Sequence, residues 1–122
     1  KGHGIAISII KNILESQDVN HIIFQVLPTL KPGVIIHFHD ILYPFEYPKE
    51  WILGGVAWNK SYILRAFLQN NDAYQIIFFN DYLKRFHRKI LHAALPISVR
   101  DTEPDRAMVN APGNSIWFRK LR

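Results

Sequence analysis

The segment from 32 to 48, PGVIIHFHDILYPFEYP, places titratable side chains at the end of an apolar run. An imidazole beside a carboxylate can act as a general base with its orienting partner, or as two ligands of a divalent ion. His39 and Asp40 close the run and are therefore our candidate catalytic residues and candidate metal ligands, although a purely structural role for both stays open. His37 lies inside the run, where a histidine is more often a core residue.

The loop that follows is unusually aromatic and is interrupted by prolines. Small-molecule sites are mostly apolar and carry a few placed polar groups. On that basis we predict a substrate site, and its candidate residues are Tyr43, Glu46, Tyr47 and Trp51. The same aromatic side chains could instead pack the loop against a sheet, and the sequence does not separate these two interpretations.

The elements around these residues predict an α/β fold. The run from 34 to 38 is short, rich in branched residues and bounded by Gly33, as expected for a strand that is covered on both faces. Apolar residues between 19 and 30 recur every three or four positions, which predicts a helix before it. A helix, a tight turn and a buried strand form the second half of a βαβ unit. Ligands of such sheets bind beyond the carboxyl ends of the strands, which is where the candidate catalytic pair stands.

Four further segments have a readable pattern. Residues 58–71 predict a helix, residues 73–79 a second buried strand, and residues 114–121, which alternate in polarity, a strand near a sheet edge. The stretch from 5 to 10 fits either a strand or a helix, and we favour the strand.

A basic helix is predicted after residue 80. Its pattern places Leu83, Phe86, Ile90 and Ala94 toward the core, and Lys84, Arg85, Arg88 and Lys89 toward water. The helix has no interleaved aromatic stacking face, and no nucleic-acid-binding module is recognised in the sequence. We therefore interpret its charge as a solvated face and expect neither nucleic acid nor a membrane as a partner.

Composition limits the class of protein. A chain of 122 residues with 48% hydrophobic content suits a single globular domain over residues 1–122. The sequence contains no cysteine, which excludes disulfides and thiolate chemistry. No apolar run reaches the length of a membrane span and the first residues lack a signal-peptide layout, so we expect a cytoplasmic protein. No glycine-rich phosphate loop or G-x-S-x-G motif supports a nucleotide-hydrolysing enzyme or a serine hydrolase.

Residues 18–122 resemble the carboxyl-terminal half of a class I S-adenosylmethionine-dependent methyltransferase. The resemblance rests on PGVIIHFHDILYPFEYPKEW, AWNKSYILRAFL, YQIIFFNDYL and GNSIWFRK, which occur in that order. It implies a partial Rossmann-like three-layer sandwich, in which residues 33–39, 73–79 and 114–121 are the fifth, sixth and antiparallel seventh strands. It also implies S-adenosylmethionine as cofactor and, as acceptor, a small-molecule hydroxyl on a sugar or a secondary metabolite.

By the same resemblance, His39 and Asp40 lie on the acceptor side, as a base or as ligands of a divalent metal that orients the hydroxyl. The aromatic loop then shapes the acceptor pocket. The glycine-rich turn and the acidic residue that bind the cofactor in this family would precede this segment and are absent from the sequence, and Lys60 stands where an acidic residue is expected. We therefore expect a methyltransferase fragment that is inactive alone.

Two alternatives stay open. The chain could be a non-catalytic interaction domain that forms a homo-oligomer through exposed sheet surface. Less favoured is a metal-dependent hydrolase that uses His37, His39 and Asp40, because the HxHD pattern is weak when taken alone.

Overall fold

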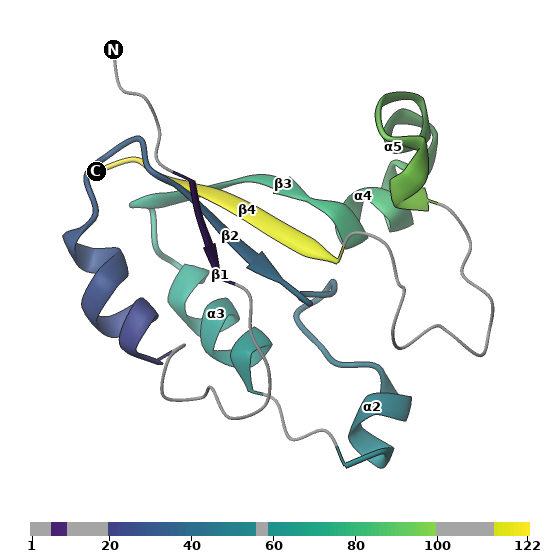
Figure 1. The fold of residues 1–122 in the computed structure, drawn as a ribbon, viewed down its shortest axis with the longest axis horizontal. Helices are drawn as coiled ribbons and strands as arrows, with labels where there is room; N and C mark the ends of the chain where they lie inside the picture. The colour runs from purple at the N-terminus through teal and green to yellow at the C-terminus, as the bar shows by residue number, and fades with distance from the viewer. Residues whose placement is uncertain (1–5, 10–19, 56–58, 100–113) are drawn as a thin grey trace.

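The computed structural model describes residues 6–9, 20–55, 59–99 and 114–122, which form a mixed α/β fold. Its strands are β1 (Ala6–Ile9), β2 (Ile35–His39), β3 (Tyr74–Phe79) and β4 (Ser115–Lys120). They form one sheet in the order β1-β2-β4-β3, in which β1 and β2 are parallel and β4 is antiparallel to both of its neighbours (Figure 1). The α/β class and the antiparallel last strand are thus confirmed, and residues 6–9 form the strand that we favoured there.

The helical elements alternate with these strands. They are the π-helical turn η1 (Ile22–Val26), the 3-10 turns η2 (Leu27–Thr29) and η3 (Pro96–Val99), and the α-helices α2 (Lys49–Leu53), α3 (Lys60–Leu68), α4 (Asn80–Phe86) and α5 (Arg88–Ala94). The helix predicted over 58–71 corresponds to α3, whereas α2 lies within a stretch that was predicted as loop. None of the helices in the described ranges is long and apolar enough to cross a membrane.

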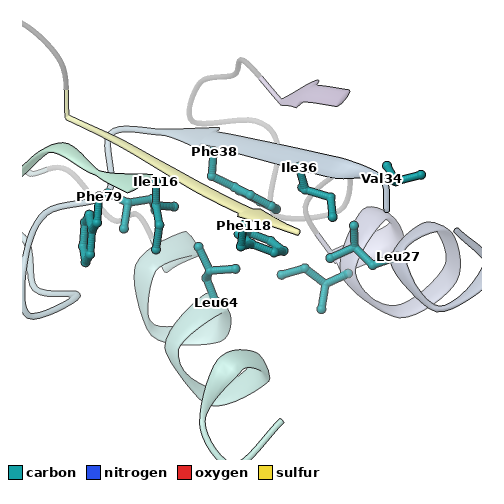
Figure 2. Close-up of a cluster of buried hydrophobic side chains, with 10 residues drawn as sticks. Leu27, Val34, Ile36, Phe38, Leu64, Phe79, Ile116 and Phe118 are labelled. Atoms are coloured by element: carbon teal, nitrogen blue, oxygen red, sulfur yellow. The ribbon is translucent and has the colours of Figure 1, made fainter. Parts of the chain in front are cut away.

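The core lies on one face of the sheet. Ile36 and Phe38 of β2 stand opposite Phe118 and Ile116 of β4, and all four side chains are fully buried. The side of α3 that carries Leu64 and the η1–η2 segment pack against them; the remaining members of the cluster are Ile23, Leu27, Val34, Ile41 and Phe79. Figure 2 shows Leu64 and Leu27 pointing from the helical side toward the sheet side chains. Burying each such side chain contributes about 1.5–3 kcal/mol, so this layer supplies much of the driving force for folding.

The other face of the sheet is only partly covered. Its positions on β2 and β4 are half-buried, namely Ile35, His37, His39, Ser115 and Trp117. Residues 34–38, which we expected to be covered on both faces, are thus buried on one face and half-buried on the other within the described ranges. Within the described ranges the sheet and one helical layer are seen, and the third layer of the expected sandwich is not among them.

The order of the strands corrects two further expectations. The predicted buried strand, β3, is an edge strand, and Ile76 and Ile77 are 44% and 39% exposed. The predicted edge strand, β4, lies in the interior of the sheet between β2 and β3. The reason is topological, because the last strand inserts between two earlier ones and moves β3 to the edge.

The basic segment after residue 80 is not one helix. It breaks at His87, whose backbone angles (φ −137°, ψ 38°) are not helical, and so forms α4 and α5. Phe86 and Ile90, which were expected to face the core, are 54% and 69% exposed, and Ala94 is exposed too. Leu91 is the buried residue of α5 instead. The break changes the direction of the chain, so a single helical periodicity no longer describes both halves.

Candidate functional site

The candidate site lies at the carboxyl end of β2. His39 Nδ1 is 2.7 Å from Asp40 Oδ2, so the structure brings the predicted catalytic pair into direct contact. Asp40 has a φ of 56°, in the left-handed region that aspartate adopts more readily than most residues. This backbone conformation follows the last strand residue immediately. It allows the carboxylate to meet the preceding imidazole instead of pointing to the opposite face of the sheet.

The carboxylate of Asp40 is held in its ionised form. Its pKa is lowered, first by the hydrogen bond from His39 and further by the positive charge of Lys60, while partial burial acts in the opposite direction. Lys60 is the first residue of α3 and is itself buried, with 8% exposure. An ionised carboxylate on Nδ1 fixes the tautomer of the imidazole, which makes Nε2 the basic nitrogen of the neutral ring.

His37 has the contacts of a structural histidine. Its Nε2 lies 2.9 Å from Ser115 Oγ across the sheet, and its ring stacks on Trp117 at a centroid distance of 4.2 Å. The pKa of His37 is lowered, mainly by burial and also by the positive charges of His39 and Lys60. Burial and these neighbours favour the neutral ring. The contacts agree with the prediction of a structural role for a histidine inside the strand.

Tyr47 and Trp51 connect the aromatic loop to the start of α3. The backbone amide of Ser61 donates a 2.8 Å hydrogen bond to the hydroxyl oxygen of Tyr47, whose ring stacks on Trp51. Both aromatic side chains are buried, with 7% exposure each. Burial raises the pKa of Tyr47, and the negative charge of Asp40 raises it further. Tyr47 is therefore a neutral phenol that lies within electrostatic range of Asp40.

Glu46 and Tyr43, the other two predicted substrate residues, point to different neighbours. The hydroxyl of Tyr62 in α3 donates a 3.0 Å hydrogen bond to Glu46 Oε2 at the surface. Tyr43 instead packs edge-on against Phe79 and Phe86, and its amide donates a 2.8 Å hydrogen bond to an Asp81 carboxylate oxygen. The structure thus gathers three of the four residues at the start of α3 and places Tyr43 against β3 and α4.

Several polar residues near the site were not selected as site residues from the sequence. The family resemblance points to Lys60 only because it implies an acidic residue at that position. No local sequence pattern points to Ser61 or Ser115. The Ser61 Oγ atom is buried and has no hydrogen-bond partner within the described part of the structure. The contact of Ser115 with His37 joins residues 78 positions apart, and no local pattern reveals such a pairing.

The contact of His39 with Asp40 has the geometry of a general base and its orienting carboxylate, and the described residues were compared with what a metal or a nucleotide cofactor needs. They contain no group of three histidine or acidic side chains that could hold a metal ion. The Asp40 carboxylate and the His39 Nδ1 atom are also engaged with each other. For S-adenosylmethionine, the glycines of these ranges are badly placed, since Gly33 precedes β2 and Gly54 and Gly55 follow α2. None of them follows the carboxyl end of a strand, where a phosphate- or nucleotide-binding turn stands in such sheets.

Comparisons of the chain with protein-family models, with curated proteins and with solved structures give no match.

Proposed function

We propose that this chain forms the acceptor-binding half of a class I S-adenosylmethionine-dependent methyltransferase that modifies a small-molecule hydroxyl. The observation that supports the proposal most is the direction of the strands. The motif resemblance assigns β2, β3 and β4 to the fifth, sixth and antiparallel seventh strands of that sheet. In the described sheet β1, β2 and β3 run in one direction and β4 alone runs in the other.

The catalytic role falls to the pair at the end of β2. His39 accepts the proton of the acceptor hydroxyl, and Asp40 orients the ring and balances the charge that the ring gains. The carboxyl end of a strand is the edge at which ligands of such sheets bind. The acceptor hydroxyl is a sugar or secondary-metabolite group, positioned by the Glu46–Tyr62 pair and by the aromatic wall of Tyr47 and Trp51. Positioning of this kind lowers the activation free energy of methyl transfer, because the entropy cost of orienting the reacting groups is paid on binding.

S-adenosylmethionine supplies an activated methyl group in this family, and the described residues offer it no glycine turn. The proposal therefore requires a cofactor-binding half from sequence upstream of these strands. Isothermal titration calorimetry tests this requirement directly. We expect no measurable heat of S-adenosylmethionine binding to the 122-residue chain, and saturable binding to a version extended by its upstream coding sequence. Binding by the short chain would contradict the missing-half assignment, and no binding by the extended version would contradict the family.

The role of the pair is tested in the extended version. His39→Gln should lower kcat by about 10²–10⁴-fold, the range of general base catalysis, with little change in S-adenosylmethionine affinity. His92→Gln on α5 is a matched control, because it removes an exposed histidine outside the site. Formation of S-adenosylhomocysteine with a panel of sugar and phenolic acceptors is the measurement. Equal activity of the His39 variant and the control would remove His39 from the mechanism.

A second candidate function is supported by the exposed edge of the sheet. β3 is the edge strand of the described sheet and exposes Ile76 and Ile77, and such edges pair with other chains unless they are protected. A non-catalytic domain that oligomerises through β3 would sediment as a concentration-dependent dimer, and Ile77→Lys would return it to a monomer. A compact monomer at every concentration would exclude this function.

A further inference from the structure

Three aromatic side chains beyond the end of β3 form one cluster, which we call the aromatic platform: Tyr43, Tyr82 and Phe86. The ring of Tyr43 lies edge-on to each of the other two at a centroid distance of 5.3 Å. The rings of Tyr82 and Phe86 are 4.9 Å apart. These contacts show that the three rings share one location, and Tyr82 and Phe86 are 37% and 54% exposed there. The platform therefore presents aromatic surface to the surroundings.

The platform lies at the same edge of the sheet as the His39–Asp40 pair. β2 and β3 run in one direction, since each is antiparallel to β4, and α4 begins directly after the carboxyl end of β3 (Figure 1). The ends of β2 and β3 are separated by β4, which corresponds to two strand spacings, or roughly 10 Å. Two linked sugar rings cover such a distance, whereas a single ring does not.

An ion pair stands beside the platform. One carboxylate oxygen of Asp81 accepts hydrogen bonds from the Tyr43 amide at 2.8 Å and from Arg85 Nε at 3.0 Å. The side chain of Arg85 is 51% exposed, and its charge is balanced by this carboxylate. Lys84 is directed elsewhere, because it donates to Asn114. Paired charges beside the rings suit a neutral ligand that forms hydrogen bonds better than they suit an anion or a cation.

The contacts between the rings decide where a ligand lies. Rings that pack against each other leave no slot between them, so a ligand contacts the outer surface of the platform with one of its own faces. A pyranose ring has an apolar C–H face that packs on an aromatic ring, and a rim of hydroxyls that forms hydrogen bonds. A flat apolar ring would instead cover part of the ion pair without bonding to it, which is unfavourable.

We propose that the aromatic platform is a second acceptor subsite, which binds a sugar ring linked to the ring that carries the reacting hydroxyl. Tyr82 and Phe86 pack against the C–H face of this sugar, and Arg85, held by Asp81, donates to its hydroxyls. The acceptor class is then a disaccharide or a larger glycoside. This inference rests on the proposed function, because that function places the reacting hydroxyl at His39.

NMR titration of the 122-residue chain with cellobiose, maltose and lactose tests the subsite. We expect saturable shifts of the Tyr82 and Phe86 ring signals, and weaker binding of methyl glucoside, which has one ring. Phe86→Ala should raise the Kd about two- to tenfold, the usual effect of losing one aromatic contact, and Phe86→Tyr should restore it. Phe24→Ala is the matched control, because Phe24 is 64% exposed on η1 and lies outside the platform. Circular dichroism checks that all variants remain folded.

Several results would overturn the inference. They include no saturable shift with any of the three disaccharides, and the same loss of affinity in Phe86→Ala and Phe24→Ala. Binding of 2-naphthol without binding of the sugars would show an apolar subsite. A dimer of the unchanged chain that dissociates in Phe86→Ala, seen by sedimentation without sugar binding, would show that a second copy covers the platform.

Failure of the subsite and failure of the proposed function give different results in the version extended upstream. The subsite predicts that Phe86→Ala raises the KM for a disaccharide acceptor and leaves kcat almost unchanged. An unchanged KM in an active enzyme would remove the subsite and keep the methyltransferase. Disaccharide binding that depends on Phe86, in a version that forms no S-adenosylhomocysteine with any acceptor, would keep the sugar site and remove the methyltransferase.

Discussion

The ammonium group of Lys120 donates a 2.8 Å hydrogen bond to the carbonyl oxygen of Pro28, which joins the end of β4 to the η1–η2 segment. The same ammonium group lies 3.2 Å from the carbonyl oxygen of Leu27, which also accepts a hydrogen bond from the hydroxyl of Tyr74. Carbonyls near the end of a helical segment lack some of their backbone partners, and side chains can supply them. The Leu27 carbonyl also accepts from the Leu30 amide, so the Lys120 contact contributes most at the Pro28 carbonyl. Lys120 is 7% exposed and meets this need from the neighbouring layer.

Lys120→Met should therefore destabilise the fold. The substitution keeps most of the apolar stem but removes a charged donor from the carbonyls of Leu27 and Pro28, a change that costs about 1.5–3 kcal/mol. Urea unfolding at neutral pH measures the difference. Arg119→Met is the control, because Arg119 is the exposed neighbour on the same strand and its loss should cost little. Equal destabilisation by both substitutions would show that the carbonyl contacts of Lys120 are unimportant.

Asp40 should make the stability of the fold depend on pH in the acidic range. Its pKa is lowered in the folded state, mainly by the hydrogen bond from His39, so the folded protein binds this proton less readily than the unfolded chain does. Stability from this group is therefore present above its ordinary pKa of 3.8 and is lost as the pH falls through the folded pKa. Asp40→Asn should flatten the acid limb of a plot of unfolding free energy against pH.

Urea unfolding over a series of acidic buffers gives this plot. Glu50→Gln controls for the loss of a carboxylate elsewhere, since Glu50 is exposed in the first turn of α2. The same acid slope in Asp40→Asn and in the unchanged protein would contradict the His39–Asp40 bond.

His37 should titrate below the ordinary histidine value of 6.5, because burial and the nearby positive charges lower its pKa. The unfolded chain then takes up the proton first, so the contribution of His37 to stability is complete above pH 6.5 and decreases as the pH falls below it. The NMR chemical shift of its ring protons against pH gives the midpoint directly. Exposed His92 provides an internal comparison in the same spectra. A midpoint for His37 at or above 6.5 would contradict its half-buried position against Trp117.

Leu64→Ala should be among the most destabilising single changes. Leu64 is fully buried between α3 and the sheet, and removing a side chain from such a site costs about 2–5 kcal/mol. Leu53→Ala makes the same chemical change at a position with 76% exposure and should have little effect. A thermal unfolding comparison of the two variants measures the contribution of the helix–sheet layer.

Local pattern predicted the elements that position the site. The apolar run that becomes β2 and the helix that becomes α3 were both visible in the sequence, because their periodicity and boundaries depend on neighbouring residues. The contact of His39 with Asp40 also followed from adjacency at a strand end. Their roles in catalysis stay predictions.

Contacts between distant segments were not predictable in this way. The exposure of β3 depends on where β4 enters the sheet. An apolar segment has the same sequence pattern whether its strand lies at the edge or in the interior, so the pattern could not predict this exposure. The break at His87 has no glycine or proline to mark it, so the exposed positions of Phe86 and Ile90 were missed. The placement of Ser115 beside His37 follows from strand register, which a single sequence does not reveal.

The insertion of β4 between β2 and β3 has a consequence for the order in which the molecule is assembled. Neither of the earlier strands hydrogen-bonds to the other, since each pairs with β4. During synthesis, β2 and β3 therefore leave the ribosome with facing backbone groups that stay bound to water, and the gap between them is filled only after Ser115–Lys120 have been made.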